Sequence, residues 1–214
     1  MLPHHGHMGT IAVTMTPHDD LARMPATALA ASFTYAEACR AGLSDRRLAS
    51  LVSSGAVLRI GRGVYRRADA PLVDDDLHEL AARVPDATLC LVTALARHGL
   101  TDQIPDRIDV ALPRDRRAPK VSALVAWHRF DRSTYGVGRD VVDLGDGRSI
   151  GVYNPKRCVV DAFRLRHLYG EDLAVEALRR WLRRPDATPA ALLELARLFP
   201  KAEAALRAAL RVLL

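Results

Sequence analysis

The sequence predicts an α+β protein, with an N-terminal winged helix-turn-helix followed by a mixed α/β domain that ends in a helical bundle. Two short helical patterns flank Gly42, and a strand-turn-strand pattern follows them. Helix-start signals recur in roughly the last sixty residues. The expected domains are a flexible tail over 1–20, a DNA-binding domain over 21–70, a linker over 71–76 and a C-terminal domain over 77–214.

The composition is that of a folded protein without a membrane segment. The chain has 214 residues, of which 49% are hydrophobic and 26% charged, enough for one sizeable core. It contains no apolar run near eighteen residues, and its first twenty residues lack a signal-peptide pattern. We therefore expect a cytoplasmic protein with no membrane partner. The histidines of the tail are compatible with metal binding, but a frayed terminus is the simpler interpretation.

The charge favours a polyanionic partner. The net charge is +6, and only three of the 31 basic residues are lysine. Nucleic acid and anionic membrane surfaces both attract such a chain. GC-rich codons would explain the number of arginines but not their placement.

The cysteines do not indicate a metal site. Cys39, Cys90 and Cys158 lie far apart, are odd in number and show no Cys/His ligand spacing. Free thiols in a reducing compartment fit this pattern, with no metal and no cofactor.

The first helices carry recognisable end signals. An Ala-rich helix is expected over 21–32. Thr34 and Glu37 have the spacing of a capping box for the next helix, and Gly42 stands where a left-handed C-terminal cap is needed. Three residues of that helix are expected to share one face: Tyr35, Ala38 and Cys39.

The helix after Gly42 has one apolar and one polar side. Ser44 is a suitable N-cap, and Leu43 and Leu48 have the spacing of a hydrophobic staple. Leu48, Leu51 and Val52 form the predicted buried stripe. Pointing away from that stripe are Arg46, Ser50 and Ser53, with Arg47 on the flank.

A hairpin follows this helix. Gly55 ends the helix, and "AVLRI" and "VYRR" alternate apolar and basic residues around "GRG". Leu58 and Ile60 are expected to face the core, and Arg59 the solvent. Helix, turn, helix and hairpin together predict a winged helix.

The rest of the chain begins with an acidic break, "ADAPLVDDD". Helices are expected over "LHELAARV" and "TLCLVTALARHGL", and strands over "RIDVAL", "ALVAWHRF" and the pair around "LGDGRS", with Asp146-Gly147 as its turn. Asn154 and Pro155 form an N-cap and first-turn pair, a device that Thr188 and Pro189 repeat.

The arginines of the N-terminal module point to DNA. The second helix of such a pair lies in the major groove, where arginine can bond guanine through two nitrogens. The alternatives are a solvated arginine face and a winged helix that contacts protein. The predicted roles are base contacts by Arg46 and Arg47, phosphate contacts by Ser44 and Ser50, and wing contacts by Arg59, Arg62, Arg66 and Arg67.

Three segments of the sequence resemble one family. They are 33–67 with its "RGVY" wing, 93–114, and 153–184 with "PKRCVVDAFR". They resemble AbiEi-type antitoxins of type IV toxin–antitoxin and phage-defence systems. The resemblance implies a winged helix that binds inverted operator repeats, with two protomers per operator, and represses its own operon. It also implies a C-terminal domain that counters, directly or indirectly, a nucleotidyltransferase-like toxin.

The sequence does not contain a complete motif of the enzyme classes considered. No phosphate-binding Gly-rich loop is present, and Pro105-Asp106 lacks the downstream D/E-x-K of a nuclease. Asp161 with Arg157 and Arg164 forms a candidate site in the antitoxin domain, although a structural ion pair explains their helical spacing more simply. We therefore expect no catalytic activity. The alternatives are a ligand-responsive winged-helix regulator without a toxin partner and, without a supporting motif, an enzyme that modifies the toxin.

Overall fold

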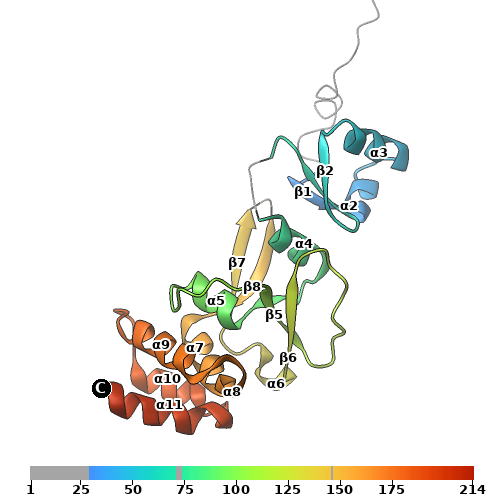
Figure 1. The fold of residues 1–214 in the computed structure, drawn as a ribbon. Helices are drawn as coiled ribbons and strands as arrows, with labels where there is room; N and C mark the ends of the chain where they lie inside the picture. Colours follow the sequence, from blue (N-terminus) through green and yellow to red (C-terminus); the bar gives the residue numbers. More distant parts are fainter. Residues whose placement is uncertain (1–28, 71–73, 146) are drawn as a thin grey trace, which may run out of the picture. The chain divides into compact units, whose positions relative to one another are not determined.

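The computed structural model describes residues 29–70, 74–145 and 147–214, and the chain divides into two compact units (Figure 1). Of the described residues, one unit comprises 29–59 with 65–70, and the other comprises 60–64 with those from 74 onwards. The predicted fold class is confirmed: a helix-turn-helix with a small sheet is followed by a mixed sheet and C-terminal helices.

The N-terminal part is a helix-turn-helix followed by a hairpin. Its three-stranded sheet has the order β1-β3-β2, so β3 is the central strand. The elements are β1 (Ser32–Thr34), α2 (Tyr35–Arg40), α3 (Asp45–Ser53), β2 (Val57–Gly61) and β3 (Val64–Arg67).

The predicted helix ends are confirmed. The backbone N–H of Thr34 donates to Glu37 Oε2 at 2.6 Å, and that of Glu37 donates to Thr34 Oγ1 at 3.2 Å. Gly42 has φ +84°, which a residue with a side chain rarely adopts. Ser44 Oγ accepts the backbone N–H of Arg47 at 3.3 Å. These caps satisfy amides that the short helices leave without a partner.

The helix predicted over 21–32 was wrong at its end. Residues 21–28 of the predicted helix lie outside the described residues, but 29–31 are not helical and Ser32 belongs to β1. In α2, Ala38 is buried and Tyr35 and Cys39 are exposed. The side-chain hydrogen bond between Tyr35 and Cys39 agrees with the prediction that these residues share a face.

The inward face of the first hairpin strand was also predicted incorrectly. Val57 is 1% exposed, whereas Leu58 is 41% exposed and Ile60 is half-buried. The predicted alternation does not hold in this strand, because the consecutive residues Leu58 and Arg59 are both exposed. Arg59 is exposed, as predicted.

The second unit is built on a five-stranded mixed sheet of order β6-β5-β4-β8-β7. Strand β4 pairs antiparallel with β5 and parallel with β8, β5 pairs parallel with β6, and β7 pairs antiparallel with β8. The elements up to the last strand are α4 (Asp75–Arg83), β4 (Thr88–Leu89), α5 (Leu91–Arg97), β5 (Ile108–Pro113), β6 (Val125–Phe130), α6 (Arg132–Tyr135), β7 (Arg139–Gly145) and β8 (Arg148–Tyr153).

The C-terminal helices pack around α7. This helix contacts α5, α9, α10 and α11, and each of its residues from Arg157 to Phe163 is buried. Figure 1 shows the helices gathered at the end of the unit that holds the C-terminus. They are α7 (Pro155–Arg164), α8 (Arg166–Tyr169), α9 (Glu171–Leu182), α10 (Pro189–Ala196) and α11 (Pro200–Leu213).

Two expectations in this unit need correction. Asp74 caps α4 through Leu77 N–H at 3.1 Å, and Asp75 and Asp76 form its first turn, so this part of the predicted linker is helical. Carboxylates stabilise the positive end of a helix dipole, which explains why an acidic run begins a helix here. The helix predicted over 88–100 is instead β4 followed by α5.

The other helix starts were predicted correctly in most details. Asn154 Oδ1 accepts the Arg157 N–H at 3.0 Å, and Pro155 and Pro189 stand in the first turn of their helices. Thr188, however, makes no side-chain cap bond. The β7–β8 hairpin is confirmed, and Asp146 of its predicted turn lies outside the described residues.

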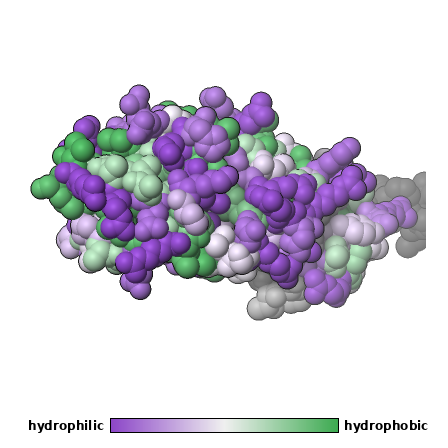
Figure 2. All heavy atoms as spheres, turned by 90° about the horizontal axis from the view of Figure 1, so that it is seen from below, coloured by the Kyte–Doolittle hydropathy of each residue, from purple (hydrophilic) through white to green (hydrophobic). Residues whose placement is uncertain are grey.

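The surface is mixed in character. Figure 2 shows apolar areas separated by hydrophilic side chains on the face that it presents. None of the described helices is long and apolar enough to cross a membrane.

Candidate nucleic-acid interface

The helix α3 presents the polar face that the sequence predicts. Ser44, Arg46, Arg47 and Ser50 are all exposed. Leu48 and Leu51, on the opposite side, are 5% and 3% exposed and pack in the small core of the helix-turn-helix. The four predicted contact residues therefore all have exposed side chains, and Ser44 is also the N-cap of the helix.

Tyr35 fixes the start of this helix and was missed in the sequence analysis. Its hydroxyl donates to Asp45 Oδ1 at 2.5 Å, which joins the first residue of α2 to the first residue of α3. The hydrogen bond to the Asp45 carboxylate raises the pKa of Tyr35 above its ordinary value. The two residues are ten positions apart, a separation that helical periodicity does not detect.

The hairpin presents a narrower basic surface than predicted. Arg59 and Arg62 are exposed, and Gly63 with φ +71° allows the two-residue turn that carries Arg62. Arg67 is half-buried and bonds Asp69 through Nε at 2.9 Å and Nη2 at 2.6 Å. This ion pair offsets the charge that Arg67 would offer to a phosphate.

Arg66 does not have the predicted outward position. It is 5% exposed, because it alternates with buried Val64 along β3 and shares the inward side of that central strand. We therefore remove Arg66 from the candidate interface. The residues that retain an exposed position are Ser44, Arg46, Arg47, Ser50, Arg59 and Arg62.

The three candidate residues of the antitoxin domain meet in the interior. Arg157 Nε donates to Asp161 Oδ2 at 2.9 Å, and Arg164 Nη2 lies 3.0 Å from Asp161 Oδ1. Arg157 and Asp161 are 0% exposed. Arg157 Nη1 also donates to the carbonyls of Thr134 and Val137 at 2.7 and 2.6 Å. These contacts are those of a structural ion pair, which was the simpler interpretation of the helical spacing.

Aromatic rings enclose this cluster. The Arg157 guanidinium lies 4.3 Å from the ring centroids of Tyr153 and Phe199, and that of Arg164 lies 4.3 Å from Phe130. Burial raises the pKa of Asp161, and the two arginines oppose part of that rise. Two buried guanidiniums share one carboxylate, so the cluster retains one positive charge in excess.

Two histidines of the second unit, His98 and His128, have structural partners. His98 Nε2 lies 2.8 Å from the carbonyl of Tyr153, and His128 Nε2 lies 2.8 Å from Asp109 Oδ1. Burial lowers the pKa of His98 below its ordinary value. These contacts support structural roles for both histidines.

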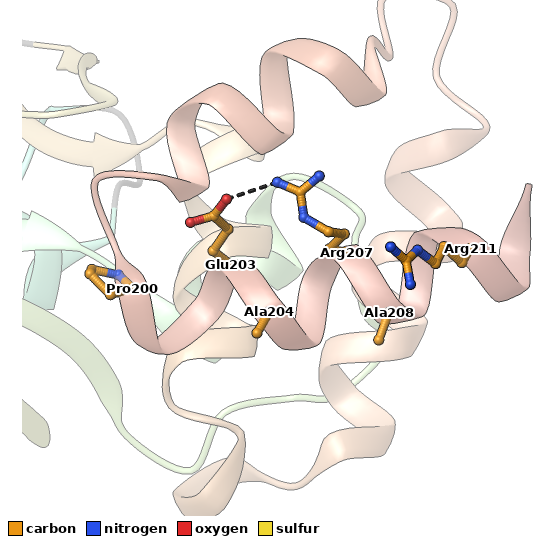
Figure 3. Close-up of a pocket in the computed structure, with 6 residues that line it drawn as sticks. All are labelled: Pro200, Glu203, Ala204, Arg207, Ala208 and Arg211. Atoms are coloured by element: carbon orange, nitrogen blue, oxygen red, sulfur yellow. Dashed lines mark hydrogen bonds and ion pairs between the residues drawn. The ribbon is translucent and has the colours of Figure 1, made fainter.

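The second unit also carries surface hollows. Figure 3 shows one along the outer side of α11, where Ala204 and Ala208 leave space beside Arg207 and Arg211. Arg207 Nη2 bonds Glu203 at 2.8 Å, which neutralises its charge. Another hollow, of about 550 Å³, is lined by Arg164, Arg166, His167, Glu171 and Lys201.

The fold and the exposed basic face define a winged-helix domain of the kind found in transcriptional regulators. Residues 32–68 match the family model described as transcriptional regulator, AbiEi antitoxin. The resemblance inferred from the sequence is thereby confirmed over the winged helix. The matched residues end at position 68, so the resemblance over 93–114 and 153–184 stays a prediction. The comparison with curated proteins found no match.

Proposed function

We propose that this protein represses its own operon by binding operator DNA and acts as the antitoxin of a type IV toxin–antitoxin system. The observation that carries the proposal is the exposed arginine pair on α3, inside a segment that matches the AbiEi regulator model. Arg46 and Arg47 contact base edges in the major groove, and Ser44 and Ser50 contact phosphates. Arg59 and Arg62 contact the backbone or the minor groove from the hairpin.

Two protomers bind each operator. One helix-turn-helix contacts only a few base pairs, so an inverted repeat requires two modules on the DNA. Native mass spectrometry of the protein with its promoter fragment measures this ratio. One protomer on a complete operator would contradict it.

The second unit neutralises a nucleotidyltransferase-like toxin without catalysis of its own. The buried cluster of Arg157, Asp161 and Arg164 supports this unit structurally, since it lies at the centre of the helical bundle. We place the boundary between the two activities just before α4, whose N-cap is Asp74.

Co-expression with the adjacent toxin gene, from an independent promoter, tests both parts. Arg46→Ala removes a base contact but leaves the second unit unchanged, so cells should still grow in the presence of toxin. Arg40→Ala, an equal change in charge on an exposed arginine of α2 outside the candidate interface, is the matched control. If folded Arg46→Ala fails to restore growth, DNA binding is part of neutralisation. If the wild type fails as well, the antitoxin proposal is wrong.

A further inference from the structure

The hollow at the junction of α7, α8, α9 and α11 is positively charged. Its lining holds the cationic groups of Arg164, Arg166 and Lys201, the titratable His167, and the single carboxylate of Glu171. The lining therefore favours an anion even with Glu171 ionised. Its volume, about 550 Å³, is within the range of small-molecule sites.

Arg164 connects this hollow to the buried charge beneath it. Its guanidinium has Asp161 as an ionic partner, and Arg157 binds the same carboxylate more closely. Nε of Arg164 is buried and has no hydrogen-bond partner among the described residues. An excess positive charge in a buried cluster is unfavourable, and an anion next to Arg164 would offset it.

Two helix ends contribute to the same hollow. Glu171 is the first residue of α9 and Lys201 the second of α11, helices of 12 and 14 residues. Neither helix has a side-chain cap bond at its start. The first turn of α9 is acidic, with Glu171 and Asp172, and Pro200 in the first turn of α11 has no N–H. The cationic side chains of the lining, rather than the helix ends, therefore favour an anion.

Arg166 holds the lining in place. Its Nη1 donates to the carbonyls of Phe163 at 2.8 Å and Lys201 at 3.1 Å, so it joins the end of α7 to the start of α11. Lys201 and His167 are exposed and carry no structural contact of this kind. They can therefore be changed without loss of the fold.

From these observations we propose that this hollow is a phosphate-binding site. The oxygens of a phosphate or pyrophosphate group bond Lys201 and Arg164, with His167 at the rim. The group comes either from a free nucleotide or from a nucleic-acid backbone, which present the same chemistry. The hollow beside Arg207 is a poorer candidate, because Glu203 pairs with that arginine.

Calorimetric titration of the full chain with sodium pyrophosphate and with ATP, at physiological ionic strength, tests the site. We expect saturable binding of at least one probe, and a loss of about tenfold in affinity for Lys201→Ala. Lys156→Ala is the matched control, since Lys156 is an exposed lysine of the same unit outside the hollow. It should bind as the wild type does.

A second arm distinguishes the two sources. Binding of an unrelated 20-bp duplex is compared between Lys201→Ala and Lys156→Ala. Saturable binding of a small probe with equal duplex affinities identifies a free nucleotide. Weaker duplex binding by Lys201→Ala alone identifies a nucleic-acid backbone. If no small probe saturates and both variants bind the duplex equally, or if both lose pyrophosphate equally, the proposal is wrong.

Discussion

The arginines of α3 and those of α7 occupy opposite environments. Arg46 and Arg47 are exposed, on a helix that buries only two leucines against a small core. Arg157 and Arg164 lie on a helix whose residues from Arg157 to Phe163 are all buried, between aromatic rings and a shared carboxylate. One residue type therefore serves two purposes, and partners and burial distinguish them where composition does not.

This contrast clarifies the basic composition. Codon usage would raise the number of arginines everywhere in the chain, yet one pair faces solvent on α3 and another pair lies in the core of the second unit. Exposed cations contribute to binding and little to stability. Buried cations contribute to stability only while their partner is present.

The largest expected effect is on the buried pair. Asp161→Asn leaves two interior guanidiniums without a counter-charge, so the free energy of unfolding should fall by ~3–5 kcal/mol. Urea unfolding followed by tryptophan fluorescence measures this in the second unit, because both tryptophans, Trp127 and Trp181, lie there. Asp115→Asn is the control: Asp115 pairs with Arg132 at the surface, and stability should hardly change. Equal losses of unfolding free energy in Asp161→Asn and Asp115→Asn would show that the buried and the exposed ion pairs do not differ in this way.

Substitution of the exposed arginines of α3 should weaken DNA binding and leave stability unchanged. Arg46→Ala and Arg47→Ala should each cost ~1–3 kcal/mol in binding the preferred operator and relax its specificity, with the unfolding transition unchanged. Fluorescence anisotropy with operator and mutated operator measures both properties. A change in stability without a change in DNA binding would show that Arg46 and Arg47 have a structural role, as Arg157 does.

Arg62, in the turn of the hairpin, allows phosphate contacts to be separated from base contacts within the candidate interface. Arg62→Ala should weaken operator and unrelated DNA by similar factors, because a phosphate contact carries no sequence information. The slope of log affinity against log salt should become shallower by about 0.9. A selective loss of operator binding would show that Arg62 contacts bases instead.

The smallest effect concerns pH. His98 has a lowered pKa in the folded state, so its neutral form stabilises the protein above pH 6.5. That contribution decreases as the pH falls through the folded-state value, since the unfolded chain then takes up a proton first. Thermal unfolding of wild type and His98→Gln between pH 7.5 and 5 should show the smaller decline in the variant. If the stability of the wild type and of His98→Gln declines in parallel, His98 is not a source of the pH dependence.

Local signals in the sequence were sufficient for the winged helix. The Thr34 and Ser44 caps, the positive φ of Gly42 and the exposure of Arg46 all follow from interactions within a few residues. Arg66 was mispredicted because its burial depends on the position of β3 between two other strands. A single hairpin pattern does not contain that information.

The hollow beside Arg164 lay beyond prediction for a related reason. Its residues come from four helices that become neighbours only when the bundle packs. The i,i+3 and i,i+4 spacing around Asp161 did predict the ion pairs of α7. That spacing could not show that the cluster is fully buried, because burial of α7 depends on α9, α10 and α11.

The most direct test of the central claim is a titration of the wild-type protein with its own promoter fragment and with an unrelated fragment of equal length. At physiological salt the promoter should bind more tightly, and Arg46→Ala should reduce that preference while Arg40→Ala retains it. Equal affinity of the wild type for the two fragments would contradict the account, because the exposed arginines would then supply charge without sequence recognition.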